Sequence, residues 1–161
     1  MPWRCAKVFT WKFDIVMQID INKYLGRWYE IAKIPKQFEQ NFTNVTADYS
    51  LNSDGTINVI NSGYSFDDKV SITGTARQTD VPNLLKVSFF SSIESDYNIL
   101  YVDQHYNYAV IGGKDKNTLW ILSRFPFIDY TILDLLIDIA ASKGYNTKNL
   151  TLTNQEPHDV L

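Results

Sequence analysis

The stretch Tyr24-Leu25-Gly26-Arg27-Trp28-Tyr29-Glu30-Ile31-Ala32 decides how the rest of the sequence is interpreted. From Trp28 onward, an extended chain would point successive side chains to two opposite faces. Both faces carry large or apolar groups, so we expect a strand with a packing partner on each side. Gly26 leaves room for a close backbone approach where this strand begins. A glycine two residues before a tryptophan is a weak signal by itself, and the segments that follow determine its meaning.

The composition favours a single β-rich domain. The chain has 161 residues, which is enough for one domain with a sizeable core. Aromatic residues make up 14% of the chain, as is typical of β structure. The formal net charge of −3 provides no general basic field, so we expect no nucleic-acid partner. The single cysteine, Cys5, excludes an intrachain disulfide, which fits a reducing compartment.

A series of short strands follows the opening one. Pro35 ends the first strand and starts a loop that runs to Asn44. Seven further strands are expected, separated by turn-forming residues such as the Asp54-Gly55 pair. Their expected ranges are 45–51, 56–60, 70–78, 84–90, 97–102, 106–111 and 118–124. Tight turns without helices between them predict antiparallel, up-and-down pairing. The sequence therefore predicts an all-β, eight-stranded up-and-down antiparallel barrel, just wide enough for a small ligand.

Beyond the eighth strand the pattern changes to that of a helix. Asp129 suits an N-cap, and residues 130–143 carry a broad apolar stripe. Gly144 suits the C-terminal cap of this helix. A helix this apolar is expected to pack on the outside of the barrel. A short extra strand is expected at 150–152, and a turn of helix at 20–25.

Three motifs, in this order, resemble the signature of the lipocalin family. The first is Gly26 to Ala32, and the third is Arg124 at the end of the eighth strand. The second is the loop Val102-Asp103-Gln104-His105-Tyr106, which lacks the threonine usual at its start but keeps Asp103 and Tyr106. Within the family, the chain is most similar to the group formed by bacterial outer-membrane lipocalins, plant temperature-induced lipocalins and apolipoprotein D.

The resemblance implies a structural role for the motif residues. In the family, the tryptophan seals the closed end of the barrel and the arginine lies across its ring, by a cation–π contact and by guanidinium donors that reach nearby carbonyls. We therefore assign five residues to fold stability: Gly26, Trp28, Asp103, Tyr106 and Arg124.

The resemblance also implies a mainly apolar cavity that fits an acyl chain. The alternative is that the inner side chains simply fill a packed core. As a buried carboxylate, Glu30 is expected to be paired with Arg77, Arg124 or a tyrosine hydroxyl. The residues expected to line the cavity share an inward parity: Glu30, Ala32, Ile34, Ala47, Tyr49, Leu51, Ile57, Val59, Leu85, Val87, Phe89, Trp120 and Leu122.

The function implied by the resemblance is binding and carriage of a fatty acid, a lysophospholipid or a similar small hydrophobe, in membrane maintenance or lipid stress. The alternative is a protein-interaction module that uses the open-end loops 35–44 and 91–96 and has no small-molecule ligand. We expect no enzyme, metal or cofactor, because His105 and His158 are far apart and no cysteine falls on a barrel strand. We expect a monomer or a weak dimer.

The predicted organisation is an N-terminal extension at 1–18, a lipocalin domain at 19–156 and a C-terminal tail at 157–161. The extension has two interpretations: a non-native segment upstream of a start at Met17, or a basic, aromatic segment that contacts a membrane. We recognise no signal peptide or lipid-attachment motif in it, so the expected location is cytoplasmic or peripheral to a membrane. A different natural N-terminus would make the protein secreted or periplasmic. The sequons at Asn41, Asn44 and Asn149 are interpreted as chance matches.

Overall fold

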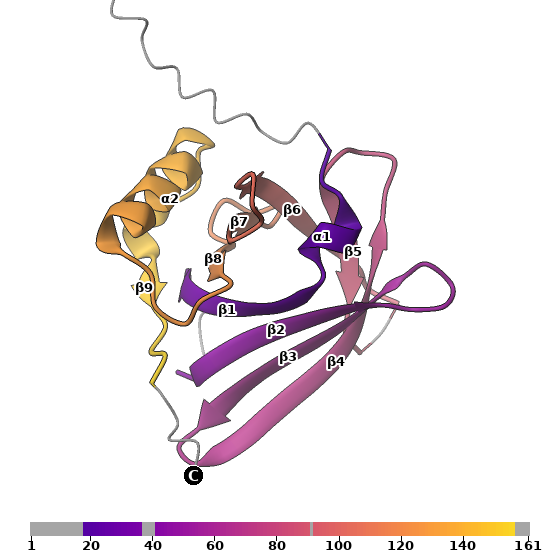
Figure 1. The fold of residues 1–161 in the computed structure, drawn as a ribbon, viewed down its shortest axis with the longest axis horizontal. Helices are drawn as coiled ribbons and strands as arrows, with labels where there is room; N and C mark the ends of the chain where they lie inside the picture. Colours follow the sequence, from indigo (N-terminus) through magenta and orange to yellow (C-terminus); the bar gives the residue numbers. More distant parts are fainter. Residues whose placement is uncertain (1–17, 37–40, 91, 157–161) are drawn as a thin grey trace, which may run out of the picture.

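The computed structural model describes residues 18–36, 41–90 and 92–156, and Figure 1 shows its course. A short helix, α1 (Ile21–Tyr24), precedes the first strand. The strands of the barrel are β1 (Gly26–Lys33), β2 (Thr43–Leu51), β3 (Ile57–Ser65), β4 (Asp68–Gln78), β5 (Leu84–Ser88), β6 (Ser95–Val102), β7 (Tyr108–Gly112) and β8 (Leu119–Ser123). Then come helix α2 (Tyr130–Ser142), a 3-10 turn, η1 (Thr147–Asn149), and strand β9 (Thr151–Leu152).

The sheet closes on itself through β1. Consecutive strands from β2 to β8 pair in order, and β1 pairs with both β8 and β2. Every one of these pairs is antiparallel, for example Arg27 opposite Asp48 and Tyr29 opposite Ser123. Strand β9 pairs with the last two residues of β1, Ala32 and Lys33. The predicted eight-stranded up-and-down barrel is therefore confirmed.

Some element boundaries differ from the prediction for local reasons. Strand β3 runs through Asn61 to Gly63, which were expected to form a turn, because its ladder with β4 continues to Ser65 opposite Asp68. The chain reverses instead beside Phe66, which has a φ of 57°. Strand β7 begins at Tyr108 rather than Tyr106. Tyr106 has a φ of 56°, a left-handed conformation that cannot continue a strand.

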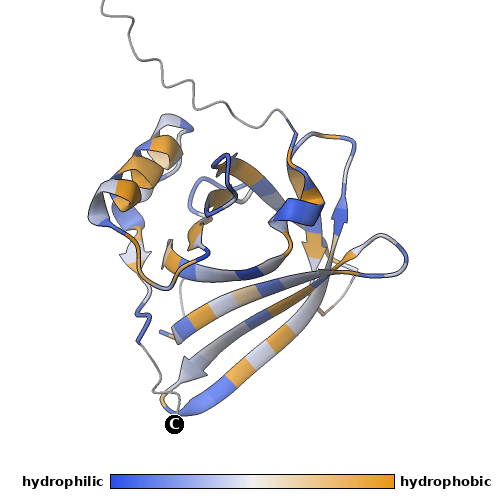
Figure 2. Ribbon diagram, in the orientation of Figure 1, coloured by the Kyte–Doolittle hydropathy of each residue, from blue (hydrophilic) through white to orange (hydrophobic). Residues whose placement is uncertain are grey.

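Helix α2 covers one outer face of the barrel, as expected (Figure 1). It begins at Asp129, whose side chain accepts a hydrogen bond of 2.7 Å from the Thr131 amide. Its buried residues are Leu133, Leu136, Ile139 and Ala140, which pack against the outward side chains of β1, β7 and β8. Figure 2 shows the hydrophobic character of this helix. No helix in the described part of the chain is both long enough and apolar enough to cross a membrane.

The contact expected between Arg124 and Trp28 is present at the closed end. The guanidinium carbon lies 3.8 Å from the centre of the indole ring, and Trp28 is fully buried. The same guanidinium donates to the carbonyl oxygens of Tyr106 at 3.0 Å, Arg27 at 2.9 Å, and both Lys23 and Tyr24 at 2.9 and 3.2 Å. One side chain thus ties together α1, β1 and the loop before β7.

Two further motif residues shape this end of the barrel. Gly26 has a φ of +98°, and a Cβ placed on it would lie 3.3 Å from Nη1 of Arg124. Asp103 accepts hydrogen bonds from the amides of His105, Asn107 and Tyr108, so its carboxylate holds the tight turn between β6 and β7. These contacts of Gly26 and Asp103 lie outside the barrel interior, so both residues have structural roles.

Candidate functional site

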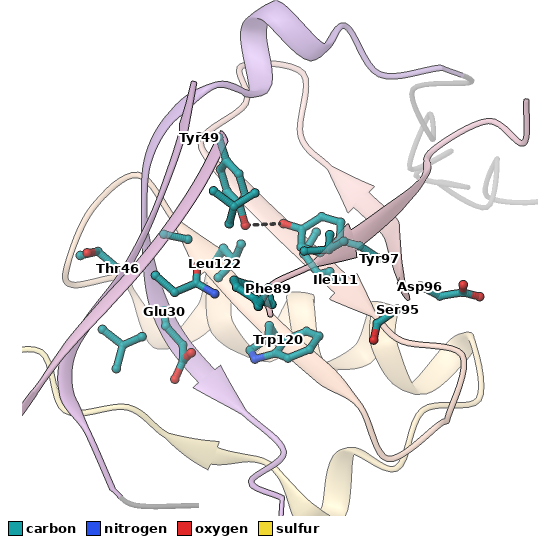
Figure 3. A pocket seen from close by; sticks show the side chains of 15 residues that line it. Glu30, Thr46, Tyr49, Phe89, Ser95, Asp96, Tyr97, Ile111, Trp120 and Leu122 are labelled. Carbon is teal, nitrogen blue, oxygen red and sulfur yellow. Dashed lines mark hydrogen bonds between the residues drawn. The ribbon is translucent and has the colours of Figure 1, made fainter. Parts of the chain in front are cut away.

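An apolar cavity of about 180 Å³ lies inside the barrel (Figure 3). The strands contribute its walls because their alternate side chains point inward. Most of the groups on its surface are aliphatic or aromatic. Its lining consists of Glu30, Val45, Thr46, Ala47, Tyr49, Val59, Asn61, Val87, Phe89, Ser95, Asp96, Tyr97, Ile111, Trp120 and Leu122.

A chain of three tyrosine hydroxyls crosses the barrel at the inner end of the cavity. The hydroxyl of Tyr97 on β6 lies 2.9 Å from that of Tyr49 on β2 and 2.5 Å from that of Tyr24 on α1. Figure 3 shows Tyr49 and Tyr97 pointing toward each other across the interior. Burial raises the pKa of Tyr49 to about 12, and it raises the pKa values of Tyr24 and Tyr97 well above their ordinary value. All three therefore carry their protons at neutral pH.

Glu30 lines the cavity, and its carboxylate has a partner that the sequence did not indicate. Glu30 is buried, and its Oε1 accepts a hydrogen bond of 2.7 Å from the Thr153 hydroxyl. Arg77 instead pairs with Glu94, while Arg124 is engaged at the closed end. Thr153 was not anticipated because it lies in the segment after β9, which only the three-dimensional fold brings to β1. The hydrogen bond from Thr153 holds the Glu30 carboxylate in place as part of the cavity wall.

The segment after β9 also joins the strands beside the cavity. The Gln155 side chain donates from Nε2 to the carbonyl of Glu30 at 2.9 Å and to that of Val45 at 2.8 Å. The Asn44 amide donates to the carbonyl of Asn154 at 2.8 Å. Gln155 is buried, so these bonds are shielded from water. The segment thus fixes the spacing of β1 and β2 where they form one side of the cavity.

Polar side chains contribute to the cavity wall beside the loop between β5 and β6. Asp96 borders the cavity, but its side chain points away from it and pairs with Lys86, on the opposite face of the sheet from Val87 and Ser95 (Figure 3). Ser95 lies next to it at the start of β6. The Ser95 hydroxyl therefore makes the wall more polar where β5 and β6 approach their connecting loop than at Val87 and Ile111. Such a gradient suits a ligand that has a polar head and an apolar chain.

The structure brings together eight of the thirteen residues that were expected to line the cavity. They are Glu30, Ala47, Tyr49, Val59, Val87, Phe89, Trp120 and Leu122. Ile57 and Leu85 also point inward, but they are buried in the core that contains Tyr24 and Trp28 at the closed end. Their parity was correct and their depth was not.

Three of the expected lining residues point elsewhere. Ala32 and Ile34 pack in the outer cluster beneath α2, because the register of β1 against β8 shifts between Glu30 and Ala32. This irregularity moves the following side chains to the other face of the strand. Leu51 lies at the last position of β2 and is 51% exposed, so it projects beyond the barrel into solvent.

Seven lining residues were not predicted: Val45, Thr46, Asn61, Ser95, Asp96, Tyr97 and Ile111. Alternation along the sixth and seventh strands would have identified Tyr97 and Ile111. Thr46 follows a register shift between Thr43 and Thr46, and Asn61 lies where β3 was expected to end. These two positions had no signal in the sequence.

The described residues offer little for chemical catalysis or metal binding. No group of three His, Cys, Asp or Glu side chains lies close enough to hold a metal ion within the parts of the chain that the structure describes. His105 is exposed in the loop before β7, away from the cavity lining. What the lining can do is solvate an apolar chain and accept or donate a few hydrogen bonds.

A second hollow lies outside the barrel. It measures about 520 Å³ and is formed by the start of α2, the preceding loop and the segment around β9, with Phe127, Leu133 and Leu152 on its surface. Phe127 and Leu152 are each 62% exposed. The hollow is wider but shallow, so it would leave much of a bound hydrophobe in water. The interior cavity is therefore the stronger candidate.

Comparison with known proteins agrees with this architecture. The family profile described as "Lipocalin-like domain" matches residues 19–155. The outer membrane lipoprotein Blc of Citrobacter freundii is 40% identical over 145 residues, which cover 88% of this chain and 82% of that protein. Temperature-induced lipocalin-1 of Arabidopsis thaliana is 34% identical over 155 residues, 89% and 83% of the two chains. Mouse apolipoprotein D is 37% identical over 147 residues, which cover 84% of this chain and 77% of apolipoprotein D.

Proposed function

The chain belongs to the lipocalin family, whose members bind small hydrophobic ligands, and from this premise we propose that its barrel binds and carries a fatty acid or lysophospholipid. The observation that carries the proposal is the mainly apolar cavity between Ala47, Val87 and Trp120, since an apolar lining suits an acyl chain. The polar head would lie at the open end of the barrel, near Ser95.

Burial of the acyl chain would supply the binding energy. Each methylene removed from water contributes about 0.8 kcal/mol, so about ten buried methylenes would be needed to contribute about 8 kcal/mol before the loss of mobility is subtracted. An affinity near the micromolar range needs about 8 kcal/mol net. Contacts of the head with the rim would have to offset the cost of immobilisation. This estimate favours long chains over short ones.

Titration with a fluorescent fatty acid tests the proposal. Val87→Trp would place an indole in the cavity and abolish saturable binding, since Val87 is buried in the lining. Ser88→Trp is the matched control, because Ser88 is the neighbouring residue of β5 and points to the other face. Absence of binding to the unchanged protein, or equal loss in both variants, would contradict the proposal.

We further propose that the protein works at a membrane surface. Three large hydrophobic side chains at the open end are exposed: Phe66 by 96%, Phe90 by 84% and Ile93 by 75%. The relative from Citrobacter freundii is named as an outer membrane lipoprotein, and this similarity favours a membrane-associated or periplasmic location for the present protein. The cytoplasmic location expected from the sequence has no such support.

Vesicle co-sedimentation tests the membrane proposal. Replacing Phe66, Phe90 and Ile93 with serine should lower the bound fraction, whereas Val81→Ser should not, since Val81 is exposed by 56% but lies in the turn between β4 and β5 at the closed end. The exposure of Phe66, Phe90 and Ile93 also favours a second candidate function, which is contact with a protein partner through the open end of the barrel. Unchanged vesicle binding in the triple variant would leave that candidate as the better account of the exposed residues.

A further inference from the structure

The tyrosine chain at the inner end of the cavity has one more hydroxyl proton than it has hydrogen bonds between its oxygens. Tyr24, Tyr97 and Tyr49 carry three hydroxyl protons, and the three oxygens are joined by two hydrogen bonds. Within the described residues these hydroxyls make no other hydrogen bond, so one O–H is left without an acceptor in every possible arrangement. A buried donor without an acceptor is costly, and a ligand that supplies the acceptor recovers that cost.

The position of the spare proton depends on the direction of the two bonds. If Tyr24 donates to Tyr97 and Tyr97 to Tyr49, the spare proton is on Tyr49. If both outer hydroxyls donate to Tyr97, it is on Tyr97. Only the remaining arrangement leaves it on Tyr24. Tyr49 and Tyr97 line the cavity and Tyr24 does not, so an acceptor in the cavity would select one of the first two arrangements.

A neutral oxygen suits this site better than a carboxylate. One O–H group replaces only a small part of the hydration that an ionised carboxylate loses in an apolar cavity. The raised pKa values of Tyr24, Tyr49 and Tyr97 indicate that their surroundings disfavour negative charge. A ketone or hydroxyl oxygen on the chain needs a single donor, and the site offers a single donor.

We propose that Tyr49 and Tyr97 form a hydrogen-bond donor site for a neutral oxygen on the ligand's acyl chain, so that the cavity takes an oxygenated fatty acid. The inference deepens the proposed function and rests on it, because it assumes that an acyl chain occupies the barrel with its head at the open end. The tyrosines lie at the inner end of the cavity, so the oxygen would lie well away from the head, and ketones at two carbons of the chain test two depths.

The test compares octadecanoic acid with its derivatives that carry a ketone at carbon ten or carbon twelve. The dissociation constant of each is measured by displacement of a fluorescent fatty acid from the full chain. The informative quantity is the ratio of the ketone's dissociation constant to that of octadecanoic acid. In the double variant Tyr49→Phe/Tyr97→Phe this ratio should rise about tenfold for at least one ketone, because the ketone oxygen is then buried without a donor.

Tyr24→Phe is the matched control. It removes a hydroxyl from the same chain but leaves the bond between Tyr49 and Tyr97 and one spare proton on that pair. The ratio in this variant should stay at or below its value in the unchanged protein. A ratio that is the same in the double variant and the unchanged protein for both ketones would overturn the proposal. Equal weakening of all three acids in the double variant would also overturn it, because the carboxyl group would then lie at the tyrosines.

A second measurement does not depend on the variants. The infrared carbonyl band of the bound, carbon-13-labelled ketone should lie at lower frequency than in an alkane solvent, since a hydrogen bond weakens the C=O bond. An alkane-like frequency for both ketones in the unchanged protein would overturn the donor site. The proposed function fails separately, if neither octadecanoic acid nor its ketones bind at all; binding without the band shift contradicts only the inference about Tyr49 and Tyr97.

Discussion

Replacing Arg124 with alanine should destabilise the protein without altering the cavity. The side chain stacks on Trp28 at 3.8 Å and donates to four backbone carbonyls. Water can replace it at Lys23 and Arg27, which are exposed, and the Tyr24 carbonyl keeps its bond from the Trp28 indole at 2.8 Å. The loss then consists mainly of the bond to the buried Tyr106 carbonyl and the cation–π contact, about 2–3 kcal/mol together.

Thermal and urea unfolding followed by tryptophan fluorescence measure this loss. For a domain of this size, about 2–3 kcal/mol corresponds to a Tm lower by roughly 4–12 °C. Arg27→Ala is the control, because Arg27 forms an ion pair with Asp48 on the surface, with its side chain 53% exposed, and should cost below about 1 kcal/mol. If the two variants lost the same stability, or if Arg124→Ala lost fatty-acid affinity at unchanged stability, the structural role of Arg124 would be refuted.

Three other predictions concern the closed end and the cavity. Gly26→Ala should destabilise the protein more than Gly55→Ala in urea unfolding, because both glycines have positive φ but only at Gly26 would the added Cβ lie against Arg124; equal losses would contradict this. On the alkaline side, stability should fall between about pH 10 and pH 12 as the unfolded chain loses tyrosine protons that the folded chain retains, since burial raises the pKa of Tyr49 to about 12. In Tyr49→Phe this alkaline loss should be smaller, and an identical alkaline pH profile would argue against the assignment. Fatty acids of increasing length should bind about fourfold more tightly per added methylene until the cavity is full, as calorimetric titration can measure, and affinity independent of length would point to head-group binding alone.

The fold could be predicted from the sequence because its signals are local. Turn residues such as Asp54-Gly55 and the cap at Asp129 mark where strands and the helix begin or end, and short connections leave few topologies to consider. Alternation then assigns most side chains to the inner or outer face. For that reason Val59, Val87 and Leu122 were expected at the positions where the structure has them.

The site was less predictable because its limits depend on tertiary structure. The register shift after Glu30 sends Ala32 and Ile34 outward, and a strand with apolar groups on both faces gives no sign of such a shift. Alternation also cannot say how deep an inward residue lies, which is why Ile57 was expected in the cavity rather than in the closed-end core. Thr153 could not be matched with Glu30 from the sequence, since 123 positions separate them.

The N-terminal extension predicted at 1–18 lies, apart from residue 18, outside the residues that the structure describes, and so does the tail at 157–161. A start at Met17 and a membrane-contacting segment both remain predictions for that extension. Comparing the full chain with one that begins at Met17 distinguishes them. Equal folding and equal vesicle binding would favour the upstream start, and weaker vesicle binding by the shorter chain would favour the membrane segment.

The most direct test of the central claim is a crystal structure of the protein with an octadecanoic acid that carries bromine at the middle of its chain. The anomalous signal of the bromine locates the chain independently of how the rest of the ligand is interpreted. We expect a single strong peak inside the barrel, between Ala47, Val87 and Trp120. A peak only in the outer hollow beside Phe127 and Leu133, or a barrel interior without bromine, would contradict the account.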